Sequence, residues 1–328
     1  MAVKKIELQE RDIKLLLHIY NGKIITGTEI RAVHFNSSKF GYKRLSRLVD
    51  AGYLSSGTYS QKMIYAGKDG RQVGKCYRLA QRGADELFSR GHITHALRAS
   101  RISLSGEDVS FILRLGAARS ALIESGTISF DEWRFPREGR EELFLPRHTP
   151  ISCLIRDIVV LRVCGPASRY LASTTQSAGS LTNRTYRVVI IYDTKSERER
   201  LLREYVSGPV YMITLADFPA LVTNLLAGNA ERHMVALISR FRELYPGASF
   251  GRPIYGSVEV SHTGSEIGQK TLLVDGITGS IFAIQEFLRW PEKWRILLVR
   301  SGVGLRLISA EEDATLNHRA TVAAAGRK

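Results

Sequence analysis

The chain has 328 residues, 44% of them hydrophobic and 9% aromatic, which is enough apolar surface for two folded cores. Its formal net charge is +15, and the first 100 residues contribute +10 of it, from 18 Lys and Arg against 8 Asp and Glu. This concentration of positive charge would attract a polyanionic partner to the first 100 residues. The other 228 residues carry only +5, so they are not a basic tail. No apolar run is long enough to span a membrane, which predicts a cytoplasmic protein. The three cysteines lie far apart in the sequence, which predicts neither a disulfide framework nor a metal site, and we expect no cofactor.

Three amphipathic segments open the chain and predict a core of three helices. The first begins after Gln9-Glu10, carries apolar residues at helical spacing and stops at Asn21-Gly22. The second begins at Thr26, whose spacing to Glu29 fits a capping box. The third spans residues 36–52, and its pattern assigns Phe40, Leu45, Leu48 and Val49 to the inner side and its cations and hydroxyls to the outer side.

Strand patterns follow the third helix, at residues 53–55, 63–65 and 75–79, with a turn signal at Asp69-Gly70 and then a fourth helix. This order predicts a winged helix-turn-helix whose third helix enters the major groove of DNA, with a basic hairpin beside it. A solvated surface helix would carry similar charges, so the order of the elements decides the interpretation. The predicted DNA-contacting residues are Ser38, Lys39, Tyr42, Lys43, Ser46, Arg47, Lys62, Lys68, Arg71 and Lys75.

The rest of the chain predicts a second domain. We expect the winged helix to occupy residues 1–98, an α/β domain residues 99–312 and a disordered tail residues 313–328. After a helix that opens near residue 106 and a hairpin or long loop at 135–150, strand and helix patterns alternate. They predict strands at 155–163, 186–192 and 210–214 and helices at 197–206, 215–226, 230–244 and 281–288. That alternation indicates a mixed, partly parallel sheet covered by helices.

Asp193-Thr194-Lys195, at the end of the strand at 186–192, has the acidic-x-Lys form of metal-dependent nucleases, in which a carboxylate holds Mg²⁺ and the lysine activates water. Such a site needs a second carboxylate, and Asp157 is the only acidic residue between Cys153 and Tyr192. The alternative is a polar turn before a charged helix. Asp157, Asp193 and Lys195 are therefore candidates only, and we assign no catalytic residue.

Three segments resemble the winged-helix part of replication-relaxation (MobC-like) proteins of bacterial mobile elements. They are Glu10-Arg11-Asp12-Ile13, the run from Lys43 to Leu54 and the run from Tyr77 to Leu87, and the likeness covers the first third of the chain. At Tyr192-Asp193-Thr194-Lys195 the chain departs from the family by lacking its Glu-x-Asp.

The resemblance implies a bacterial accessory factor that binds double-stranded DNA in plasmid or conjugative-element replication and mobilisation. Its expected protein partners are a relaxase, a replication initiator or a second copy of the chain, reached through the α/β domain. Two alternatives stay open: a winged-helix transcription regulator and the Mg²⁺-dependent nuclease.

Overall fold

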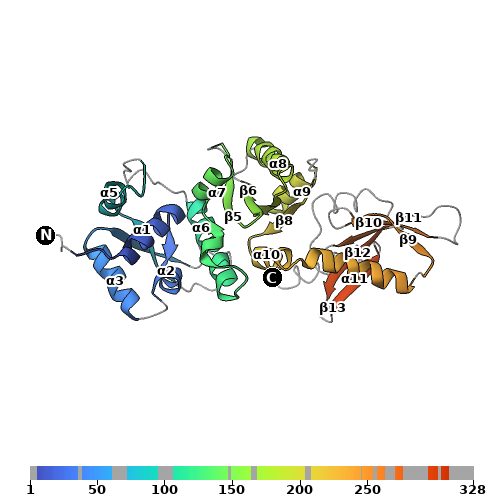
Figure 1. Ribbon diagram of the computed structural model, residues 1–328, viewed down its shortest axis with the longest axis horizontal. Helices are drawn as coiled ribbons and strands as arrows, with labels where there is room; N and C mark the ends of the chain where they lie inside the picture. The colour runs from blue at the N-terminus through green and yellow to red at the C-terminus, as the bar shows by residue number, and fades with distance from the viewer. Residues whose placement is uncertain are drawn as a thin grey trace, which may run out of the picture. The chain divides into compact units, whose positions relative to one another are not determined.

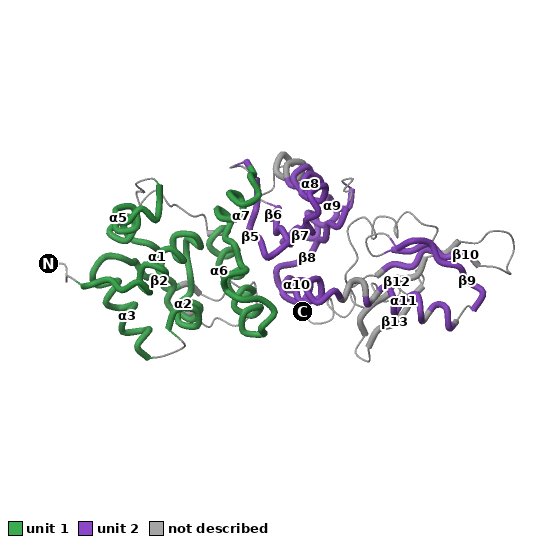
Figure 2. The backbone as a smooth tube through the Cα atoms, in the orientation of Figure 1, with its two compact units in different colours: residues 1–145 green, residues 146–328 purple. Residues whose placement is uncertain are grey.

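The computed structural model divides the chain into two compact units, residues 1–145 and residues 146–328 (Figure 2). The structure describes residues 6–35, 39–60, 72–94, 106–146, 149–163, 168–203, 208–244, 246–253, 257–262, 270–275, 295–301 and 304–309.

Unit 1 begins with α1 (Glu10–Gly22), the short β1 (Ile25–Thr26), α2 (Gly27–His34) and α3 (Lys39–Asp50) (Figure 1). The three helices share a core because each buries one stripe of apolar side chains at helical spacing. The fully or almost fully buried members are Ile13, Leu15, Leu16, Ile19, Ile30, Leu45 and Leu48. The three predicted helices are confirmed, and α1 begins and ends where its acidic start and Asn-Gly stop placed it.

A three-stranded antiparallel sheet completes this part of unit 1. β2 (Leu54–Ser60) and β3 (Gln72–Leu79) form a hairpin, and β1 pairs with the other edge of β3, so the strand order is β1-β3-β2. The predicted strand at 63–65 lies outside the described residues. The predicted fourth helix is α5 (Gln81–Ser89).

Unit 1 continues past residue 98, where the sequence placed a domain boundary. α6 (Gly106–Glu124) packs against β1 and α2, and its residues Val109 and Leu113 share a buried cluster with Ile24 and Cys76. A short 3-10 turn, η2 (Phe130–Glu132), and β4 (Trp133–Arg134) follow. This apolar contact crosses the predicted boundary, and α6 belongs to the same compact unit as the helices and hairpin before it.

A helix, α7 (Pro136–Glu142), lies in the segment for which the sequence predicted a hairpin or long loop, so that expectation was wrong there. Proline at the first helical position has the right backbone angle and needs no partner for a missing N–H. The Phe135 N–H donates to Glu138 Oε2 at 2.8 Å, which caps the helix start.

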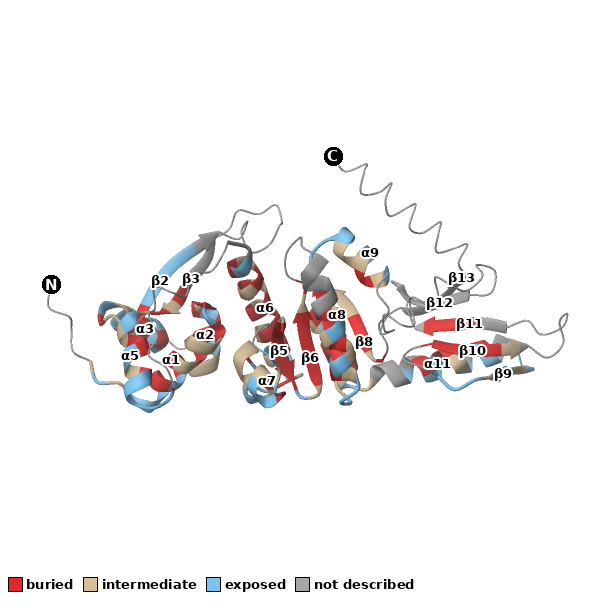
Figure 3. Ribbon diagram, turned by 90° about the horizontal axis from the view of Figure 1, so that it is seen from above, coloured by how far each residue is buried: buried red, intermediate tan, exposed pale blue. Residues whose placement is uncertain are grey.

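Unit 2 opens with four paired strands. β5 (Ile151–Ile155) and β6 (Ile158–Arg162) form an antiparallel hairpin, whereas β7 (Arg187–Tyr192) and β8 (Val210–Thr214) continue from β6 in parallel. The parallel steps are connected through α8 (Ser168–Thr182) and α9 (Lys195–Arg203). The single strand predicted at 155–163 is thus the turn and second arm of a hairpin, with Arg156 at φ 52°. Both arms are buried along almost their whole length (Figure 3).

A second sheet in unit 2 has the order β13-β12-β11-β10-β9. Only β11 and β12 are parallel; the other pairs are antiparallel. Two helices, α10 (Phe218–Leu226) and α11 (Asn229–Leu244), precede this sheet in the chain. Its strands are β9 (Ala248–Phe250), β10 (Ser257–His262), β11 (Lys270–Asp275), β12 (Arg295–Ser301) and β13 (Gly304–Ser309). The prediction of a mixed, partly parallel sheet is therefore confirmed.

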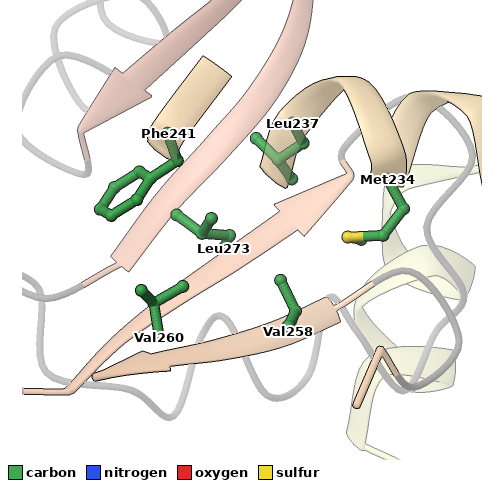
Figure 4. Close-up of a cluster of buried hydrophobic side chains, with 6 residues drawn as sticks. All are labelled: Met234, Leu237, Phe241, Val258, Val260 and Leu273. Atoms are coloured by element: carbon green, nitrogen blue, oxygen red, sulfur yellow. The ribbon is translucent and has the colours of Figure 1, made fainter. Parts of the chain in front are cut away.

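α11 covers one face of this second sheet. Its Met234, Leu237 and Phe241 form a buried cluster with Val258 and Val260 of β10, and with Leu273 of β11 (Figure 4). Predicted helix 281–288 and tail 313–328 lie outside the described residues. No helix in the described part of the chain combines the length and apolar character needed to cross a membrane.

Candidate nucleic-acid interface

α3 has one buried stripe and a broad polar face. Gly41, Leu45 and Leu48 point into the core, whereas the residues between them are mostly exposed to solvent. The exposed cations and hydroxyls are Lys39, Lys43, Arg47, Tyr42 and Ser46. These five were predicted as DNA contacts, and the structure places all of them on the solvent side of the same helix.

Phe40 was expected on the inner side of α3, but its side chain is 78% exposed. Gly41 takes the inner position instead. A Cβ atom at Gly41 would lie 3.0 Å from Phe35 Cβ and 3.1 Å from Arg31 Cγ, so α3 approaches α2 more closely than a larger residue would allow. Leu45 and Leu48 are buried as predicted, but Gly41 replaces Phe40 in the buried stripe, and the aromatic ring is left on the exposed side of α3.

A groove runs between α2, α3 and the β2/β3 hairpin. Its lining mixes polar and apolar side chains and comes from all four elements: Gly27, Thr28, Arg31, Tyr42, Ser46, Val49, Asp50, Ser56, Lys75 and Tyr77. Three predicted DNA contacts meet here, because Tyr42 and Ser46 of α3 face the same space as the exposed Lys75 of β3. The hairpin thus contributes a cation beside the polar face of α3.

Arg31 also lines the groove and was not predicted. Its guanidinium carbon lies 3.8 Å from the centroid of the Tyr42 ring, and its Nε donates to the Gly27 carbonyl at 3.1 Å. Stacking on an aromatic ring holds the planar guanidinium without neutralising its charge. Its signal in the sequence was weak: a lone arginine on the solvent side of a short helix.

Arg44 is a cation of α3 that the structure uses internally. Its Nε donates to Oδ1 of the buried Asp12 at 3.0 Å, and its Nη2 donates to the Glu7 carbonyl at 2.7 Å. The hydrogen bond to Asp12 raises the pKa of Arg44 above its ordinary value. This contact ties α3 to the start of α1.

Behind the groove, the opposite side of α2 carries a buried polar cluster. Glu29 forms an ion pair with Arg119 of α6, and both side chains are less than 5% exposed. His18 Nε2 lies 3.3 Å from Glu29 Oε1, and His18 Nδ1 lies 2.9 Å from His34 Nε2. The cluster thereby joins α1, α2 and α6 through side chains that solvent barely reaches.

Burial sets the protonation of this cluster. Desolvation lowers the pKa of His34 from 6.5 to about 3, and it lowers the pKa of His18 as well. For Glu29, desolvation favours the neutral acid, but the charge of Arg119 and the hydrogen bond from His18 outweigh it, and the pKa is lowered. Two neutral histidines and one charged carboxylate are the expected state near neutral pH.

The capping box predicted for Thr26 and Glu29 is only half formed. Thr26 Oγ1 accepts a hydrogen bond from the Glu29 N–H at 3.2 Å, as predicted. The Glu29 carboxylate does not complete the box, since it binds Arg119 in the interior. The Glu29 carboxylate thus binds the buried Arg119 of α6 and not the backbone N–H of Thr26 that the capping box predicted.

The structure separates the carboxylates that were candidates for a nuclease site. Asp157 precedes β6 and holds Arg187, the first residue of β7, through two hydrogen bonds of 2.6 and 2.7 Å. Asp193 follows the last residue of β7, so the two carboxylates lie at opposite ends of the parallel strands, about 20 Å apart at the usual rise per residue.

Asp193-Thr194-Lys195 forms the start of α9. Thr194 Oγ1 accepts from the Glu197 N–H at 3.2 Å, and Glu197 Oε2 accepts from the N–H groups of Asp193 and Thr194. The motif is thus built as a helix cap, and the side chain of Lys195 is 87% exposed. Within the described residues, no group of three or more His, Cys, Asp or Glu is arranged to hold a metal ion.

Four predicted DNA contacts, Ser38, Lys62, Lys68 and Arg71, lie outside the described residues. No protein family model matches the chain, and searches of curated proteins and of solved structures find no significant match. The likeness to replication-relaxation proteins therefore stands on the sequence motifs alone.

Proposed function

We propose that residues 10–89 form a winged helix that binds duplex DNA, with α3 in the major groove and the β2/β3 hairpin beside it. The order of helices and strands supports this proposal, as does the antiparallel β1-β3-β2 arrangement. The observation that carries it is the groove that brings Tyr42 and Ser46 of α3 together with Lys75 of β3 and Arg31 of α2.

The chemistry of this surface suits a nucleic-acid backbone flanked by base edges. Lysine and arginine donate to phosphate oxygens, and the hydroxyls of Tyr42 and Ser46 donate to or accept from base edges. The groove lining also includes Asp50, the last residue of α3, which would repel a phosphate. Among the α3 residues of the groove, Tyr42 lies nearest the start of the helix, and the N-terminal part of a recognition helix is the part that reads bases.

For the whole chain we propose an accessory role in replication or mobilisation of a plasmid or conjugative element. In this role unit 2 serves for dimerisation or for contact with a relaxase or replication initiator. The support is the sequence resemblance together with the basic, polar face of α3 in unit 1. Co-purification with a relaxase or initiator would support this role, whereas protection of the chain's own promoter without such a partner would favour transcription regulation.

The test of DNA binding uses the full chain and a fluorescently labelled duplex of random sequence, measured by anisotropy in dilute buffer. We expect a complex whose affinity is reduced by Arg31→Ala and Lys75→Ala individually, because each removes a cation from the groove. Lys23→Ala, an exposed lysine that does not line the groove, is the control. The absence of any complex at low salt would refute the proposal.

A further inference from the structure

Phe40 is the feature of α3 that the proposed function leaves unexplained. Among the described residues, five large hydrophobic side chains are strongly exposed, and two of them, Phe40 and Tyr42, are on α3. Tyr42 is covered on one side by the Arg31 guanidinium and has a hydroxyl for water. Phe40 has no hydroxyl, and 78% of its surface meets solvent, which is unfavourable for an aromatic ring.

The position of Phe40 is fixed by the fold of α3. The buried stripe of the helix consists of Gly41, Leu45 and Leu48, and the helical repeat of 100° per residue then directs residue 40 to the solvent side with Lys43 and Arg47. The ring cannot turn into the core without displacing the close contact of Gly41 with α2.

The charges around Phe40 decide between a protein partner and DNA. Lys39 precedes it, and Lys43 and Arg47 lie on the same side of the helix at three and seven positions further on. An apolar protein interface would have to desolvate these cations, at a cost, whereas a polyanion neutralises them while the ring is buried. Charge complementarity therefore favours a nucleic acid over a second protein chain.

The major groove offers one kind of apolar group at base edges, the C5-methyl group of thymine. Resting on the proposed function, we infer that Phe40 is a specificity-determining residue that packs against thymine methyl groups. The preferred duplex then contains A·T pairs where the start of α3 meets the groove. The cations hold the backbone without regard to sequence, and Phe40 adds a preference for thymine.

The experiment compares the affinity of the full chain for two pools of random-sequence duplexes. The pools have the same sequences, but one contains thymidine and the other contains deoxyuridine, which lacks only the methyl group. Burial of a methyl group corresponds to about a three- to fivefold change in affinity. We expect the wild-type full chain to bind thymidine-containing duplexes selected from the pool that much more tightly than their deoxyuridine counterparts. We expect Phe40→Ala to abolish the difference.

Phe88→Ala is the matched control, because Phe88 is also an exposed phenylalanine, at 45%, but lies on α5. It should retain the preference for thymidine. Since deoxyuridine also alters the shape of DNA, the decisive quantity is the coupling between the base change and the Phe40 change. An equal effect of deoxyuridine on wild type and Phe40→Ala would overturn the inference while leaving DNA binding intact, whereas loss of all binding by the wild type would overturn the proposed function itself.

Discussion

Arg119 on α6 donates a hydrogen bond to Glu29 on α2, and both side chains are buried although they are 90 residues apart in the chain. This ion pair lies behind the helix whose other side lines the candidate DNA groove. α6 therefore packs against the side of α2 that faces away from the groove. Gly116 permits α6 to lie this close to α2, since a Cβ atom at Gly116 would lie 3.0 Å from Glu29 Oε2.

Arg119→Met leaves a buried carboxylate without its counter-ion. Removal of one partner of a buried ion pair costs about 3–5 kcal/mol, and we expect the free energy of unfolding of unit 1 to fall by that amount in urea titrations followed by circular dichroism. The double variant Glu29→Gln, Arg119→Met should recover most of the loss, because no unpaired charge remains and the new side-chain amide can still accept from His18. Equal stability of the single variant and wild type would contradict the role of this pair.

The histidine cluster predicts acid sensitivity of unit 1. His34 titrates near 6.5 when unfolded and near 3 when folded, so between these values the unfolded chain binds the extra proton. Its contribution to stability is complete above pH 6.5 and declines as the pH falls toward 3. The loss is at most about 1.4 kcal/mol per pH unit for one histidine. Glu29, whose pKa is lowered, adds to the loss only below its unfolded pKa of 4.5.

The measurement is the urea midpoint at about pH 7.5 and about pH 5, on either side of the unfolded pKa of histidine. His34→Gln removes this titrating group but keeps a side-chain donor and acceptor. The variant should therefore show a smaller difference in midpoint between the two pH values than wild type does. An undiminished difference in His34→Gln would assign the acid sensitivity to other groups.

Two glycines in helices should respond oppositely to alanine. At Gly83 of α5 a Cβ would lie 2.3 Å from the Tyr53 carbonyl oxygen, whereas at Gly179 of α8 nothing lies within 4 Å. We expect Gly83→Ala to destabilise its surroundings by about 1–3 kcal/mol through overpacking, and Gly179→Ala to stabilise α8 by about 0.5–1 kcal/mol through backbone entropy. Hydrogen exchange of peptides from α5 and α8 measures both changes. Slower exchange in α5 of Gly83→Ala would show that the contact is looser than described.

Asp50 should weaken DNA binding, because it is an acidic residue at the end of α3 and lines the groove that we propose binds DNA. Asp50→Asn keeps the size of the side chain and removes its charge. We expect about threefold tighter binding to duplex DNA in dilute buffer and little change at high salt, where screening removes the repulsion. Asp85→Asn, on α5, is the control for a general change in net charge. Unchanged or weaker binding by Asp50→Asn would place the DNA away from the end of α3.

Local patterns predicted much of this fold because they report interactions close in the chain. The acidic start and Asn21-Gly22 end of α1, the hydroxyl cap of Thr26 and the buried strand at 186–192 depend on neighbouring residues, and each appears in the structure. The partner of Glu29 could not be predicted, since Arg119 reaches it through tertiary packing. Phe40 was misassigned for the same reason: the space for Gly41 is made by α2.

In the site, the helical repeat of α3 predicted which polar residues face solvent together. It could not show that Lys75 shares a groove with Tyr42, because that depends on how the hairpin folds back beside the helix. Arg31 was missed because nothing in its neighbours marks it. Asp193 and Lys195 show the opposite error: the sequence offered them as a candidate nuclease motif, whereas their segment forms the capped start of α9.

The salt dependence of duplex binding tests the central claim, that the polar face of α3 lies against the DNA backbone. Lys39, Lys43 and Arg47 are removed together as alanine substitutions. The control removes the same residue types at exposed positions elsewhere, as Lys14→Ala, Arg90→Ala and Lys195→Ala, and lowers the net charge equally. Each lost phosphate contact changes the slope of log K against log salt concentration by about 0.9. We predict a slope that is shallower by up to about 2.7 for the α3 variant and unchanged for the control; equal slopes for both variants would contradict the account.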